Sequence, residues 1–143
     1  KIPAFVTNKY NIEFLRGMAD TDFCLTLKKR YKDRHYYPVI SFGTTDKNMI
    51  EQIYKLLLKE GIESSLTLLR KGSRKGKTYP TNEINIYGVK KLEKWMKVIG
   101  FRSSKHLTKY CVWKKFGYCP PNTTLQQRKK ILSGESLIEN FYK

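Results

Sequence analysis

The sequence predicts an α+β domain in which a helix leads directly into a strand, and pairs of strands alternate with helices. Two observations carry this prediction. In residues 14–22 the apolar side chains recur at helical spacing, whereas residues 23–27 alternate with period two. A strongly amphipathic stretch at residues 46–60 then separates two segments that each contain a pair of alternating runs. The order of elements is therefore αββαββα, followed by further helices towards the carboxyl terminus.

The first half of the chain begins with a short extended lead-in, after which Asn11 is expected to cap the first helix. Strands are expected at residues 23–30 and 36–44, and the polar turn at residues 31–35 makes them a hairpin. The helix at residues 46–60 starts at Asp46 and is closed by Gly61. Its apolar stripe indicates that it covers the back of a sheet.

The second half repeats the pattern of two strands and a helix. Strands are expected at residues 63–71 and 81–87, joined by a loop at residues 72–77 that two glycines keep flexible. Helices are expected at residues 89–99 and 104–116, the second capped by Ser103 or Ser104. Pro120 and Pro121 break the chain before a last basic helix at residues 123–132, and the tail after Gly134 has weak signals.

The charge of the chain favours a polyanionic partner. Lys and Arg number 29 against 12 Asp and Glu, which gives a formal net charge of +17, and 10 Tyr and 7 Phe are interleaved with these cations. Each phosphate that such a surface neutralises releases counterions, so nucleic acid is the favoured partner class. Ribosomal RNA or an anionic membrane surface would suit the same charge.

The cysteines and histidines do not form a metal-binding pattern. Cys24, Cys111 and Cys119 lack CxxC spacing, which predicts free thiols in a reducing compartment. His35 and His106 have no Cys or carboxylate at ligand spacing and are interpreted as surface or groove residues. No run reaches the length of a membrane span, and a signal-peptide pattern is absent from the amino terminus. These features predict a cytoplasmic, nucleic-acid-associated protein that is not secreted; because it starts at a lysine, it could be a piece of something longer.

Residues 15–22 resemble the LAGLIDADG motif position by position. Leu15, Gly17, Asp20 and Asp22 agree with the motif, whereas Arg16 stands at its second position and a Phe follows the last Asp where the motif has Gly. Together with the order of elements, the chain resembles the LAGLIDADG homing endonuclease family over residues 1–118, and residues 119–143 form a carboxyl-terminal basic helix and tail. The lead-in is also similar to the segment before the second motif of intein endonucleases.

The resemblance implies a fold and a catalytic centre. The four strands would form a curved antiparallel saddle with the helices on its convex side. Two motif helices would pack together, and Asp22 would help to hold Mg²⁺ or Mn²⁺ at the scissile phosphates, with Asp20 as a helix-end or interface residue. Lys105 looks like the family's central lysine, with Arg102 as the fallback. Asp46 falls where some members carry a water-ordering Gln, and its alternative role is a helix cap.

The resemblance also implies a dimer interface and a DNA-binding face. The dimer interface would use the motif-helix residues Leu15, Gly17, Met18 and Thr21. Alternation places the sheet residues Thr26, Lys28, Arg30, Ser41, Ser65, Thr67, Lys71, Asn85 and Tyr87 on the face opposite the core, and the basic loop adds Arg74, Lys75 and Lys77.

These features predict a site-specific DNA endonuclease that makes metal-dependent double-strand breaks in double-stranded DNA. A chain with one motif would act as a homodimer or as half of a two-motif enzyme. One alternative is a non-cleaving protein on the same fold, either a regulator or a splicing maturase that binds intron RNA. A second is a basic ribosome-associated α/β protein.

Overall fold

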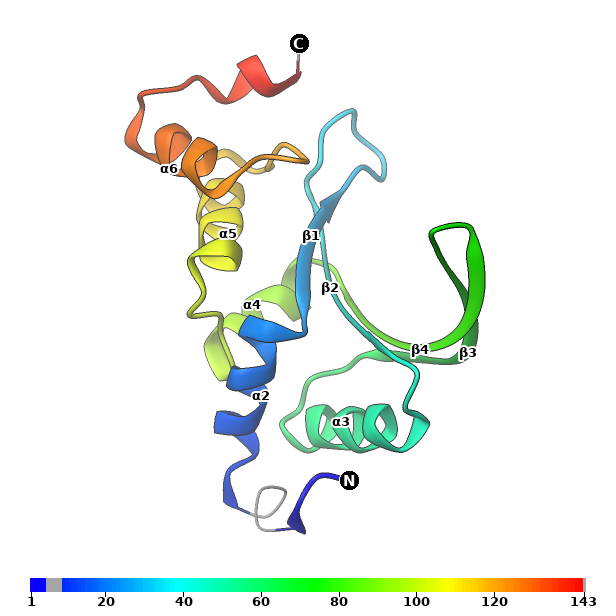
Figure 1. Cartoon of the computed structure of the whole chain (residues 1–143). Coiled ribbons are helices and arrows are strands. Elements are labelled where there is room, and N and C mark those ends of the chain that lie inside the picture. The colour runs from blue at the N-terminus through cyan, green and yellow to red at the C-terminus, as the bar shows by residue number, and fades with distance from the viewer. Residues whose placement is uncertain (5–8, 143) are drawn as a thin grey trace.

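The computed structural model of the chain describes residues 1–4 and 9–142, and for residues 70–74 the backbone alone. Its elements follow the predicted αββαββα order with further helices after it (Figure 1). The helices and strands are α2 (Asn11–Thr21), β1 (Cys24–Lys28), β2 (Tyr37–Thr44), α3 (Lys47–Lys59), β3 (Ser65–Arg74), β4 (Lys77–Tyr87), α4 (Val89–Val98), α5 (Ser104–Phe116), α6 (Leu125–Ser133) and the 3₁₀ helix η1 (Ile138–Tyr142).

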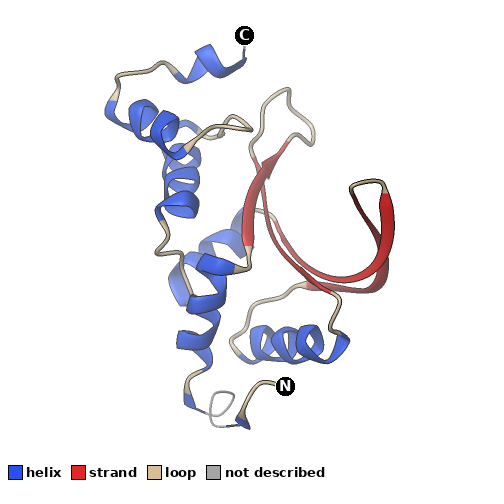
Figure 2. Ribbon diagram, viewed as in Figure 1, coloured by secondary structure: helices blue, strands red, loops and turns tan. Residues whose placement is uncertain are grey.

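The four strands form one antiparallel sheet in the order β1-β2-β4-β3, so β1 and β3 are its edges. The sheet is strongly curved, and α3 and α4 cover its convex side, whereas α5 lies beside β1 (Figures 1 and 2). The buried side chains of the strands face the helices in one continuous core. The predicted saddle, with helices on its convex side, is therefore confirmed.

Phe23 joins α2 to β1 and carries its ring into the core. It is 2% exposed, and its ring centroid lies 5.2 Å from that of Phe42 and 5.0 Å from that of Trp95. A fully buried aromatic ring contributes about 1.5–3 kcal/mol of transfer free energy. The residue that replaces the motif's glycine thus packs under the sheet.

The expected flexible loop at residues 72–77 is wrong, because both strands continue into it. β3 runs to Arg74 and β4 starts at Lys77, so Lys75 and Gly76 alone form the turn. Both turn residues have positive φ, 49° and 74°, which is the backbone of a type I′ hairpin turn. The hairpin is consequently a long, curved ribbon.

The expected cap of the first helix also differs from the structure. Tyr10 is the N-cap of α2, while Asn11 is already helical and buried, with its Nδ2 donating to Glu60 Oε1 at 3.1 Å. This contact ties α2 to the end of α3. At α6 the cap is Thr124, whose side chain and that of Gln127 form a complete capping box.

No helix in the described ranges is long and apolar enough to span a membrane.

Candidate catalytic centre and nucleic-acid interface

Asp22 ends the motif helix and is exposed at the start of β1. Its Oδ2 lies 2.7 Å from the hydroxyl of Thr21, which is also 3.1 Å from the Gly17 carbonyl oxygen. The last turn of α2 contains no basic residue. A carboxylate at a helix C-terminus is repelled by the negative end of the helix dipole. Asp22 is therefore placed where a cation would relieve an unfavourable local charge.

Asp20 has a structural role that joins the motif helix to α5. One of its carboxylate oxygens, Oδ1, accepts the backbone N–H groups of Arg102 and Ser103, both at 2.9 Å. Ser103 is the N-cap of α5 and makes no side-chain cap, and Asp20 supplies an acceptor from another element for the N–H of this N-cap residue. The helix-end role expected for Asp20 is thus found, but at the start of α5.

This contact brings the first turn of α5 to the end of the motif helix. Lys105 lies in that turn and is exposed, as is Arg102 just before it. Both cations are therefore near the carboxyl end of α2, where the sequence places the candidate centre.

Asp46 is the N-cap of α3, and its Oδ1 accepts the backbone N–H of Met49 at 3.0 Å. The helix-cap alternative is therefore confirmed. The residue is nevertheless exposed, and the pairing of Cys24 with Ser41 puts the start of β1 and the end of β2 at the same end of the sheet. Asp46 and Asp22 thus lie at one end of the β1–β2 pair, and a water-ordering role stays a prediction.

The four residues expected at the dimer interface divide into two groups. Leu15 is 0% exposed and Met18 6%, because both belong to the core of their own chain. The prediction is wrong for these two, since no partner helix can pack on buried side chains. Gly17 and Thr21 are exposed, and a Cβ built on Gly17 would meet no atom of the described residues within 4 Å. The exposed side of α2 therefore contains the small residues expected for a close helix contact.

Strand register brings the predicted DNA-contacting residues onto one face. Thr26, Val39 and Tyr87 form one row across the sheet, and the next row contains Cys24, Ser41, Asn85 and Ser65. Lys28 pairs with Tyr37 at one end, and Thr67 pairs with Glu83 at the other. This is the concave face of the curved sheet, because the alternate residues form the core under the helices.

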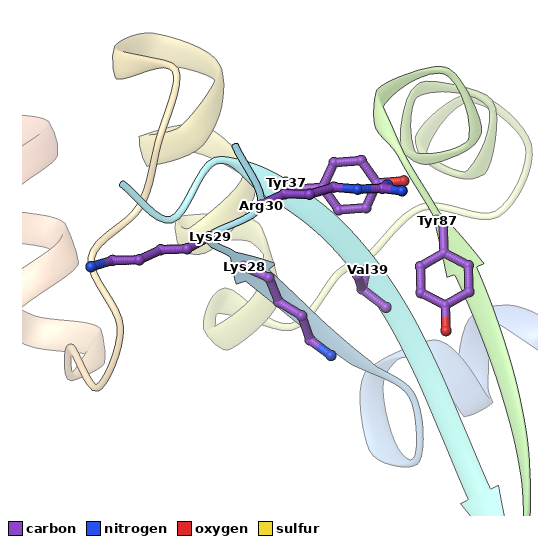
Figure 3. Close-up of a pocket in the computed structure, with 6 residues that line it drawn as sticks. All are labelled: Lys28, Lys29, Arg30, Tyr37, Val39 and Tyr87. Carbon is purple, nitrogen blue, oxygen red and sulfur yellow. The ribbon is translucent and has the colours of Figure 1, made fainter. Parts of the chain in front are cut away.

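A pocket of about 390 Å³ lies at the β1 end of this face, lined by Lys28, Lys29, Arg30, Tyr37, Val39 and Tyr87. Figure 3 shows the Arg30 side chain beside the Tyr37 ring, with Lys29 pointing away from the pair. The Arg30 Cζ lies 4.4 Å from the Tyr37 ring centroid, a cation–π contact. Stacked, exposed cations of this kind suit a phosphate backbone.

The remaining residues that are predicted to contact DNA differ in the exposure of their side chains. Lys75 and Lys77 are exposed at the end of the β3–β4 hairpin. Asn85 is 7% exposed, so it offers little surface to a ligand. The side chains of Lys71 and Arg74 lie outside the described part of the chain.

The expected surface or groove position is wrong for His106, which is 2% exposed and stacks 4.8 Å from the Phe101 ring. Burial, together with the positive charges of Lys109 and Lys105, lowers the pKa of His106 to about 4. The imidazole is therefore neutral at pH 7, in the core beside the first turn of α5.

Sequence reasoning missed Tyr37, which lines the pocket, and Lys109, whose Nζ donates to the Leu25 carbonyl oxygen on β1. Tyr37 follows from the register, because it pairs with Lys28 on the concave face. Lys109 stands four residues after Lys105, so both lie on one side of α5. This spacing of the two lysines is the sequence feature that could have identified Lys109.

The described part of one chain contains few side chains that could together coordinate a divalent metal. The described residues contain no group of three or more His, Cys, Asp or Glu that could hold a metal ion. Mg²⁺, however, is commonly bound through one or two carboxylates, with phosphate oxygens and water completing its shell. The exposed Asp22 carboxylate fits that kind of site when a second carboxylate and DNA phosphates join it.

Comparison with known proteins gives one family. The LAGLIDADG-like domain matches residues 9–100, which cover α2 to α4 and all four strands. No curated protein matches the chain. Members of this family are typically DNA endonucleases or maturases. With the motif helix, the curved sheet and this match in agreement, the chain belongs to the LAGLIDADG homing endonuclease family.

Proposed function

We propose that the protein is a site-specific DNA endonuclease that cuts both strands in a reaction that depends on Mg²⁺ or Mn²⁺. The observation that carries the proposal is the position of Asp22. Its exposed carboxylate ends the motif helix at the start of β1, beside the concave polar face of the sheet.

Asp22 and the residues around it would have separate roles in the reaction. Asp22 would hold the metal, which when bound supplies an activated water and relieves charge at the leaving oxygen. Lys105 and Arg102, held near the end of α2 by Asp20, would stabilise charge on the scissile phosphate. Thr26 on the concave face and the stacked Arg30 would position the duplex.

Each chain supplies one such centre, so a double-strand break needs two motif helices. The exposed Gly17 and Thr21 support a pairing of α2 with the same helix of a second copy, or with the other motif of a longer protein. A homodimer would favour a nearly palindromic site. The mass in solution, by sedimentation with and without duplex DNA, separates a dimer from a monomer.

A non-cleaving binder on the same fold is the second candidate, and the replacement of the motif's glycine by Phe23 favours it. The test is digestion of a library of random duplexes with Mg²⁺ or with EDTA, followed by sequencing of new ends. Paired breaks at one sequence, present only with Mg²⁺, support the endonuclease. Tight binding without any breaks would favour the binder.

A further inference from the structure

β1 is an edge strand, and its outer backbone groups have no strand partner within the described part of the chain. α5 lies along this open edge, as Figure 1 shows, and contacts β1. From this helix the Nζ of Lys109 donates to the Leu25 carbonyl oxygen at 3.1 Å. The lysine therefore spans the space between the helix and the edge of the DNA-facing sheet.

A pocket of about 260 Å³ opens beside this lysine. Its lining comes from β1, α5 and the segment before α6, and consists of Thr26, Leu27, Lys109, Cys119, Pro120, Pro121, Asn122 and Thr123. An ammonium group has three N–H donors. In the described residues the Lys109 ammonium has one acceptor, the Leu25 carbonyl, so two donors are available to the pocket.

The charges around the pocket favour an anion. Burial lowers the pKa of Lys109, and the positive charges of Arg128 and Lys105 lower it further, although Cys24 acts in the opposite direction. Among the described residues no acidic side chain forms an ion pair with Lys109. Burial also raises the pKa of the Cys119 thiol, which keeps it neutral at pH 7. An anion in this pocket would be the counter-charge that these cations lack.

The pocket is held in shape by a buried arginine. Arg128 is 3% exposed and donates from Nε to Thr108 Oγ1 at 2.8 Å and from Nη2 to the Lys105 carbonyl at 3.2 Å. Its Nη1 donates to the Thr123 carbonyl. The segment that lines one wall is thus fixed to the helix that carries Lys109.

We propose that this pocket binds a backbone phosphate of the bound duplex, with Lys109 as its principal donor and Thr26 and Asn122 beside it. The proposal rests on the proposed function, because it requires duplex DNA on the concave face. Thr26 lies four residues after Asp22, at most about 14 Å along an extended chain. With one phosphate per roughly 3.4 Å of axis on each strand, the bound phosphate lies a few nucleotides from the scissile one. Lys109 thus contacts the backbone of a strand that passes the candidate centre.

Fluorescence anisotropy over a salt series, with a mixed-sequence duplex and EDTA present, tests the assignment. Lys109→Met keeps an unbranched apolar stem and removes the charge. It should reduce the slope of log K against log salt by about 1 and weaken binding equally on duplexes of different sequence. Lys109→Arg should retain most of the slope. Lys55→Met, which removes an exposed charge from α3 on the convex side, is the matched control and should change neither quantity.

Thermal unfolding of each variant separates binding from structure. If Lys109→Met lowers the midpoint of unfolding but leaves slope and affinity unchanged at a temperature where it is folded, the lysine only covers the strand edge and the proposal is overturned. If the unmodified protein fails to bind duplex DNA, the proposed function fails as well. Normal binding by the unmodified protein with an unaltered slope in Lys109→Met overturns the phosphate site alone.

Discussion

The Asp20 carboxylate accepts the backbone N–H of Ser103 at 2.9 Å, across 83 positions of the chain. The same oxygen accepts the N–H of Arg102, so one motif residue fixes the start of α5. The two carboxylates at the end of α2 therefore have different roles. Asp20 holds the start of α5 at the end of the motif helix, and Asp22 is exposed to solvent beside it.

Replacing Asp20 should lower stability and disturb the position of Lys105. Asp20→Ala leaves two backbone N–H groups without their acceptor, which should reduce the free energy of unfolding by about 1–3 kcal/mol in urea denaturation. Asp20→Asn keeps an acceptor oxygen and should lose less. Equal stability of Asp20→Ala and the unmodified protein would contradict the capping role.

Replacing Asp22 should have the opposite effect on stability. Asp22→Asn removes a negative charge from the C-terminus of α2, and the free energy of unfolding should rise by about 0.3–1 kcal/mol at low salt. High salt should shrink the difference, because the interaction is screened. A decrease in stability measured without metal would show that the carboxylate is held by a contact that favours folding.

His106 should make stability depend on pH in the acid range. Its folded-state pKa, about 4, lies below the unfolded value near 6.5, so the unfolded chain binds the proton first. Stability should therefore fall as the pH drops from about 6.5 to 4, by at most about 3 kcal/mol from this residue. Denaturation of His106→Leu over the same range should show a shallower fall; an identical pH profile would contradict the buried neutral imidazole.

Arg128 should hold α6 against α5. Arg128→Met removes the donors to Thr108, Lys105 and Thr123, and should cost about 2–4 kcal/mol, because the buried Thr108 hydroxyl and two partly buried carbonyl groups lose their donor. Limited proteolysis should then cut the segment before α6 faster. The neighbouring exposed Lys129→Met is the control and should keep the original rate. Resistance of Arg128→Met equal to that of the control would refute the anchor.

Much of the fold could be predicted because it depends on local periodicity. The alternation in residues 23–27 sets the faces of β1, and the amphipathic stripe of α3 sets its packing side. The α5 bounds, Ser104–Phe116, agree with the prediction because Ser103 and Gly117 flank a continuous helical segment. All of these features depend on residues that are close together in the sequence.

The predictions differ from the structure where contacts between distant segments determine the position of a side chain. Asn11 has the side chain of a typical cap, yet Glu60 holds it inside the helix. Leu15 and Met18 form an apolar side of α2, and periodicity alone does not distinguish the chain's own core from a partner. Lys75 and Gly76 form a tight turn although Asn-Gly is the stronger signal for one.

The direct test of the central claim is cleavage by Asp22→Asn, measured beside the unmodified protein on the duplex recovered from the library digestion. Both proteins are assayed for binding in EDTA and for double-strand breaks with Mg²⁺. The account predicts that Asp22→Asn binds the duplex at least as tightly and makes no breaks. Breaks at an unchanged rate and position in this variant would contradict the assignment of Asp22 as the metal ligand.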